Sequence, residues 1–257
     1  MEIVIIAVVA AAASLLTFFS GFGLGTILTP VLVIFFPVEF AIALSGIVHL
    51  LNNFFKIGLV AGKIDWKLGL KFGITAAIGA FAGAELLLIF SKIEPVYTYV
   101  ISSKMFYVTY IKIIISVLMI VFALFEIVPF LNNIRFKGKM LYLGGLLSGF
   151  FGGVSGNQGA LRSAFLLRLG LTKEGFIATG IMIACMVDIT RLSVYFSRLS
   201  VINLSENILV LISAVLSAFW GAYIGSKLLK KITLKFVQYT VAVMILTLAI
   251  GLGVGLL

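Results

Sequence analysis

A short polar segment, SGNQG, interrupts a long apolar stretch near the middle of the chain. Glycines let a ligand approach the backbone closely, and turn amides before a helix carry partial positive charge. An arginine follows one turn later, and its forked guanidinium is suited to oxyanions. The segment therefore predicts a substrate site for an anion, with these residues: Ser155, Gly156, Asn157, Gln158, Gly159 and Arg162.

Glycines in this region have a second interpretation, because small residues allow close helix packing in a membrane. Packing is the preferred interpretation for the glycines before the turn, and binding is preferred for the turn itself. The packing set is Gly144, Gly145, Gly149, Gly152 and Gly153.

An acidic and a basic residue, Asp188 and Arg191, are three residues apart and so lie on one side of a helix. A buried pair of this kind either fixes packing or belongs to a site. Together with Arg162 the cluster carries net positive charge, which predicts a substrate role. Asp188 then either orients an arginine or carries a coupling proton.

The first half of the chain has a comparable region, with Ser20, Gly21 and Gly23 in a glycine-rich turn. A polar stripe at helical spacing follows it, formed by His49, Asn52, Asn53 and Lys56, of which Asn52, Asn53 and Lys56 complete the predicted substrate set. The histidine is the only one in the chain and is a candidate for proton coupling, since imidazole titrates near neutral pH. A structural role for it, and a lysine that reaches for the membrane surface, stay open.

The composition requires a membrane protein. The 257 residues are 62% apolar and 11% charged, with a mean hydropathy of +1.26, which exceeds what a soluble core needs. The net charge of +10 suits topology anchoring by loop lysines and arginines, so we expect no nucleic-acid partner. One cysteine, Cys185, excludes an intrachain disulfide, and no metal, phosphate-loop or catalytic-triad spacing occurs. We expect no enzyme, no cofactor and no metal.

Six segments are long enough to span a bilayer: 39–61, 67–90, 105–130, 173–197, 205–228 and 233–256. Two others, 3–36 and 139–170, are too long for one span and are broken by glycines. If each crosses once, the basic loop residues divide evenly between the two faces. If each returns as a re-entrant hairpin, most of them share one face, as the positive-inside rule expects. We therefore predict two hairpins, six spans and both termini outside.

Residues 1–130 and 131–257 align with each other in order along the chain, which indicates a duplication. Ser20-Gly21 aligns with Ser155-Gly156, Asn53 with Asp188, and Lys56 with Arg191. Three spans after a hairpin turn the second copy upside down, an architecture found in many secondary transporters. The predicted fold is an all-α polytopic membrane protein of two inverted repeats, each a broken re-entrant helical hairpin followed by three transmembrane helices.

The run GGVSGNQGALRSAFLLRLGLTKEGFIATGIMIACMVDITRLSVY, residues 152–195, resembles a region of the TauE/SafE family of sulfite-exporter-like permeases. The run GFGLGTILTPVLVIFFPVEFAIALS, residues 21–45, is similar to the other repeat of that family, although Phe22 and Leu24 interrupt its glycine string. The resemblance covers nearly the whole chain. It implies secondary transport of small sulfur-containing anions, such as sulfite, sulfonates or sulfoacetate, across a prokaryotic cytoplasmic membrane, commonly as export and with the proton as candidate coupling ion.

We therefore expect alternating access, with the two hairpin tips meeting near the mid-plane and Arg162 and Arg191 neutralising the charge of the substrate. The expected partners are the anion and lipid, and a homodimer is left open. A passive anion channel and a membrane subunit without transport activity remain the alternatives.

Overall fold

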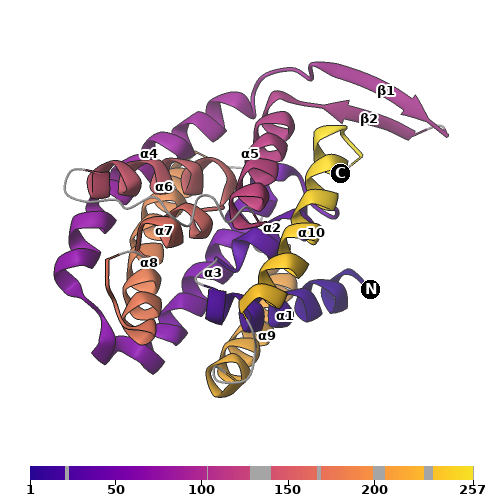
Figure 1. The fold of residues 1–257 in the computed structure, drawn as a ribbon. Coiled ribbons are helices and arrows are strands. Elements are labelled where there is room, and N and C mark those ends of the chain that lie inside the picture. Colours follow the sequence, from indigo (N-terminus) through magenta and orange to yellow (C-terminus); the bar gives the residue numbers. More distant parts are fainter. Residues whose placement is uncertain are drawn as a thin grey trace.

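The computed structural model describes residues 1–20, 23–102, 104–127, 140–166, 169–198, 206–228 and 234–256 (Figure 1). The helices of the first half are α1 (Glu2–Ser20), α2 (Gly25–Val33), α3 (Val38–Val60), α4 (Trp66–Phe90) and α5 (Tyr110–Ile127), with a short 3-10 helix at Ala61–Lys63. Those of the second half are α6 (Met140–Ser155), α7 (Gly159–Leu166), α8 (Lys173–Arg198), α9 (Ile208–Leu228) and α10 (Leu234–Gly253).

The prediction of a helical, multi-pass membrane protein is confirmed. By length and composition, four stretches in the described part of the chain can cross a membrane: Val38–Lys63, Trp66–Phe90, Lys173–Ser197 and Ile208–Lys227. Large apolar side chains such as Ile78, Leu216 and Trp220 are exposed on the outside of the bundle, as expected for a surface that contacts lipid.

A β-hairpin, β1 (Tyr97–Ile101) and β2 (Lys104–Val108), replaces the start of one predicted span. The span expected at 105–130 begins instead at Tyr110, as α5. Aromatic and β-branched residues favour the strands, and the rings of Tyr99 and Phe106 stack at 5.3 Å. An apolar run alone does not distinguish a strand of this kind from the first turns of a helix.

The second broken segment is a helical hairpin. Near the turn, Gly152 of α6 packs on Gln158, and at the far end Gly144 packs on the Phe165 ring of α7. The two helices are therefore antiparallel, and α7 returns toward the level at which α6 begins.

The first broken segment also turns back. Ser14 and Phe18 of α1 lie beside Asn52 and Lys56 of α3, so α1 and α3 run in the same direction. The next helix, α2, leads directly into α3. The Thr29 hydroxyl of α2 donates to the Ser45 hydroxyl of α3, so the two helices lie side by side and run antiparallel. The chain thus enters along α1 and returns along α2.

Two ends of the bundle can be distinguished, which we call the basic end and the terminal end. At the basic end, the Asp65 amide donates to the Thr179 hydroxyl at 2.9 Å, and Gly175 lies beside the carbonyl of Lys63. The terminal end holds the start of α3 and the end of α10, which line one small pocket. Segments near Lys63 and Lys173 therefore lie at the same end of the bundle.

Packing pairs repeat between the two halves. α1 packs along α9, and α6, its counterpart, packs along α4, the counterpart of α9. α3 packs with α8 and α5 with α10, so each of these helices contacts its own counterpart. Glycines make the two long contacts close: a Cβ on Gly149 would collide with the Ala76 backbone, and one on Gly221 with that of Ala11. The packing interpretation of the α6 glycines agrees with these contacts.

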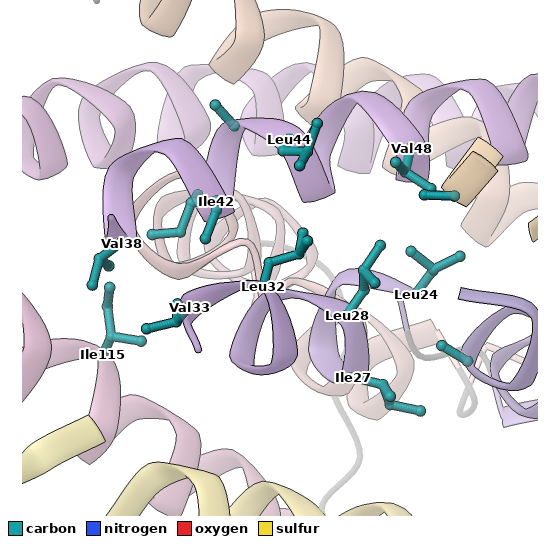
Figure 2. Packing of buried hydrophobic residues seen from close by; sticks show 14 of the residues in the cluster. Leu24, Ile27, Leu28, Leu32, Val33, Val38, Ile42, Leu44, Val48 and Ile115 are labelled. Carbon is teal, nitrogen blue, oxygen red and sulfur yellow. The ribbon is translucent and has the colours of Figure 1, made fainter. Parts of the chain in front are cut away.

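The half-helix α2 lies in the middle of the core, and all nine of its residues are buried. Its apolar side chains, including Leu28 and Leu32, face Ile42 and Leu44 of α3, with Ile115 of α5 at one end (Figure 2). Short helices with open ends are tolerated at membrane depth only where protein surrounds them. Packing against α1, α3 and α10 therefore holds a helix of two to three turns in place.

Candidate functional site

The tips of the two helical hairpins touch each other. The Thr26 hydroxyl, in the first turn of α2, donates to the side-chain oxygen of Asn157. Beside it, a Cβ on Gly25 would lie 3.1 Å from the carbonyl oxygen of Gly156, so a glycine is needed for this approach. Gly156 has φ +77°, a conformation that ends α6 and that glycine adopts without strain. Segments about 130 residues apart in sequence thus form one junction.

Asp188 of α8 binds three side chains from three parts of the chain. One carboxylate oxygen lies 2.6 Å from Nδ1 of His49, and the other accepts from Nε of Arg191 at 2.9 Å and from the Gln158 amide at 3.2 Å. His49, Gln158, Asp188 and Arg191 are all buried. The carboxylate therefore connects α3 of the first repeat to the hairpin turn and α8 of the second.

Arg191 points its terminal nitrogens at the junction of the hairpin tips. If Gly156 carried a Cβ atom, it would lie 3.2 Å from Nη1. A Cβ atom on Gly46 would lie 3.0 Å from Nη2. Neither terminal nitrogen has a hydrogen-bond partner among the described residues. The arginine thus lies at the junction, with Nε bound to Asp188 and its two terminal nitrogens not bonded.

A narrow pocket lies on the basic-end side of this junction. Its polar lining consists of Thr17, His49, Asn53, Lys56 and Arg162, and its apolar lining of Phe18, Phe176, Ile177 and Ile181, with Gly180 between. The free space is that of about one or two water molecules. A solute larger than water therefore fits only if the walls move apart.

Lys56 enters the pocket from α3 and is only 3% exposed. With the Asn52 amide oxygen turned toward it, Nζ donates to that oxygen at 3.2 Å, and the same oxygen accepts from Ser14 at 2.9 Å. The ammonium also lies 5.4 Å from the centre of the Phe18 ring, at cation–π distance. The alternative that Lys56 reaches the membrane surface is wrong, since the side chain is buried.

A second small pocket lies toward the terminal end, on the other side of the touching tips. Its lining includes Gly25, Thr29, Ser155 and Asn157, together with apolar residues of α5 and α10. The contact between Thr26 and Asn157 separates it from the first pocket.

The predicted site residues divide into several groups in the structure. His49, Asn53, Lys56 and Arg162 line the first pocket. Asn52, Gln158, Asp188 and Arg191 lie behind it and hold those residues or each other.

The turn residues face the junction or each other. Ser155 and Asn157 line the second pocket. Gly23 lies against the His49 ring, and Gly156 contacts the opposite tip. Gly159 is the first residue of α7. Ser20 ends α1, and Gly21 lies outside the described residues.

One expected feature is not present in this conformation. The amides of the turn were expected to bind the anion, but the Gly156 amide donates to the Gly152 carbonyl at 2.9 Å and the Asn157 amide lies 3.3 Å from the Ser155 hydroxyl. The turn uses these donors to close itself after α6 ends, because an amide left unpaired in the membrane is costly. Side chains, and not these two amides, provide the donors of the pocket.

Several lining residues were not predicted from the sequence: Thr17, Phe18 and Gly180. Thr17 lies shortly before the first hairpin turn, and a hydroxyl in an apolar helix is a signal that could have identified it. Gly180 makes room for Arg162, because a Cβ atom on Gly180 would lie 3.5 Å from Nε of the arginine. Only a contact between α7 and α8 gives that glycine its role.

The buried charges do not balance. Among the described residues, four buried side chains are cationic when ionised, His49, Lys56, Arg162 and Arg191, and Asp188 is the one buried carboxylate. Asp188 bonds His49 and Arg191, and Lys56 and Arg162 both line the pocket between α3 and α7. Charge at membrane depth is expensive, and a bound anion would offset part of it.

The fold and this site define a helical, multi-pass membrane protein with a positively charged centre between two helical hairpins. The chain belongs to the sulfite exporter TauE/SafE family, whose family model matches residues 6–252. That family is one of membrane transporters for sulfur-containing anions. No curated protein and no solved structure matches the chain.

Proposed function

We propose that the protein is a secondary transporter that exports a small sulfur-containing anion, such as sulfite or a sulfonate, by alternating access. The observation that carries the proposal is the pocket between the repeats, in which Lys56, Arg162 and His49 present positive charge and donors inside the bundle. Family membership supports the sulfur anion as substrate class. Arg162 supplies a forked donor for two oxygens of the anion, and Asn53 supplies a neutral one.

Alternating access requires a barrier that opens on one side at a time. In this proposal the barrier is the contact of the hairpin tips, with Thr26 against Asn157 and Arg191 behind them. Binding in the first pocket moves its walls apart to admit the anion, and this movement loosens the tip contact. The unused donors of Arg191 then bind the passing anion before it reaches the second pocket.

In this proposal the basic end lies in the cytoplasm, with both termini outside. Lys63 and Lys173 near that end support this orientation through the positive-inside rule. The first pocket then receives its anion from the cytoplasm, which agrees with export. The inverted relationship of the repeats is part of this proposal.

Proton coupling is assigned to the pair formed by His49 and Asp188. The two are 2.6 Å apart, and His49 lines the pocket, so a proton on the imidazole lies close to the anion. An anion attracts that proton and the empty pocket does not, which links the two binding events.

Counterflow in proteoliposomes tests the function. Vesicles loaded with unlabelled sulfite and diluted into labelled sulfite should accumulate label transiently and with saturation. Label that only follows the electrochemical gradient would indicate the anion channel instead. Purified protein with no flux of any kind would support the non-transporting subunit and contradict the proposal.

Replacing His49 by Gln tests the coupling. Glutamine keeps a polar group beside Asp188 but carries no titrating proton. We expect transport driven by an imposed pH gradient to fall to the rate without a gradient, while counterflow continues. A variant that responds to the pH gradient as the wild type does would show that His49 has a structural role only.

A further inference from the structure

We propose that the first pocket selects anions with two negative charges over anions with one, and that Lys56 is the residue that provides this selectivity. The inference rests on the proposed function, because it assigns the charge of the substrate of the same site. It concerns a binding preference and requires no chemical step.

The two cations of the pocket come from two different walls. Lys56 belongs to α3 and is held by α1 through Asn52, Ser14 and Phe18. Arg162 belongs to α7 and lies across α8 at Gly180. One wall therefore comes from the first repeat and the other from the second, with the narrow pocket between them.

Lys56 lies on the same face of α3 as the other polar lining residues. His49, Asn53 and Lys56 are four and then three residues apart, which is one stripe of a helix. The side chain is 3% exposed and has no carboxylate partner among the described residues, since Asp188 bonds His49 and Arg191. Its contacts with Asn52 and Phe18 position the ammonium without neutralising it.

The number of charges on the ligand then decides whether one or both cations of the pocket are neutralised. An anion with one charge, bound at Arg162, leaves Lys56 charged and buried, which is unfavourable. A dianion places a charge at each wall and also offsets the repulsion between the two cations. Thr17 and Asn53 add neutral donors that serve a monoanion and a dianion alike, whereas Phe176, Ile177 and Ile181 add none, so the two cations distinguish the charges of the ligands.

Equilibrium binding to the purified, full-length protein tests the inference, with methanesulfonate as the monoanion and sulfoacetate as the dianion. Both probes carry a sulfonate, so the ratio of their dissociation constants isolates the second charge. Isothermal titration should give a wild-type preference for sulfoacetate of about tenfold or more, the factor that one well-placed charged contact typically provides.

Lys56→Gln should reduce that preference to about threefold or less, with methanesulfonate affinity nearly unchanged, and Lys56→Arg should restore it. Lys56→Met is the second variant, because it keeps the chain length and burial without the charge. Lys227→Gln is the matched control: Lys227 is an exposed lysine that lies 4.3 Å from the Tyr223 ring, and its removal should leave the ratio as in wild type.

Two results would overturn the inference while leaving the proposed function intact. One is a wild-type protein that binds methanesulfonate as tightly as sulfoacetate. The other is a sulfoacetate preference that survives in both Lys56→Gln and Lys56→Met, in which case Lys56 only packs against Asn52 and Phe18. Wild-type protein that binds neither anion would instead contradict the proposed function, and the inference with it.

Discussion

Arg162→Gln is expected to reduce sulfite flux at low substrate concentration by about 10- to 100-fold, which is the loss that follows from removing a charged donor to an anion. Arg162 lies one turn into α7, is 4% exposed and lines the pocket. Its backbone amide bonds the Gln158 carbonyl at 3.2 Å, a contact that the substitution leaves in place. The effect should therefore appear in transport and binding, and not in folding.

Initial rates of labelled sulfite uptake in proteoliposomes, with equal amounts of inserted protein, measure this change. The uptake rate of Arg162→Lys should lie between those of the wild type and Arg162→Gln, because lysine keeps the charge but lacks the forked pair of donors. Lys227→Gln removes a positive charge near the end of α9 and should transport normally. If Arg162→Gln transported sulfite at the wild-type rate, Arg162 would not be a substrate-binding residue.

Asp188→Ala is expected to destabilise the protein by about 3–5 kcal/mol, the usual cost of leaving a buried ion without its partner. Asp188 is fully buried and is the shared partner of His49, Gln158 and Arg191. Without it, Arg191 has no anionic partner among the described residues, and three cations remain in one buried region. The contacts between α3, the second hairpin turn and α8 weaken together.

Thermal unfolding of the detergent-purified variant, followed with size-exclusion chromatography, measures this loss. Asp65→Ala provides the control for removing a carboxylate. Asp65 caps α4 by accepting from the Leu68 amide at 2.9 Å, near the surface, and its loss should cost only about 1 kcal/mol. An Asp188→Ala protein as stable as Asp65→Ala would show that Asp188 does not hold the cluster together.

The membrane class and the places where helices break could be predicted from sequence, because both depend on local composition. Uninterrupted apolar runs identify α4 and α9, and the glycines near Gly23 and Gly156 mark the two turns. The helical spacing of His49 and Lys56 also predicts correctly that they share a face, since 3.6 residues per turn is a local property.

Contacts between the halves could not be predicted in the same way. The spacing of Asp188 and Arg191 predicts their ion pair, but nothing local indicates that His49 of the other half shares the carboxylate. For the same reason Arg162 and Arg191 were expected to act together, whereas Arg162 lines the pocket and Arg191 lies behind it, at the tip junction. These assignments depend on how α3, α7 and α8 pack.

The β-hairpin shows a different limit. The β2 residues after Lys104 are uncharged and mostly apolar, so hydropathy merges them with α5 into one span. The strands are specified by cross-strand pairs such as Tyr99 with Phe106, and by Ser102, whose φ of 48° supports the tight turn. A pairing between two strands is not visible to an argument that averages over one segment.

The central claim is that a small anion binds between the two repeats, at the cationic pocket on the basic-end side of the hairpin tips. Selenite has the shape and charge of sulfite, and its selenium atom can be located by anomalous X-ray scattering. In crystals grown with selenite, the account predicts one strong selenium peak among His49, Lys56 and Arg162. A pocket without such a peak at saturating selenite, or a peak only on the protein surface, would contradict it.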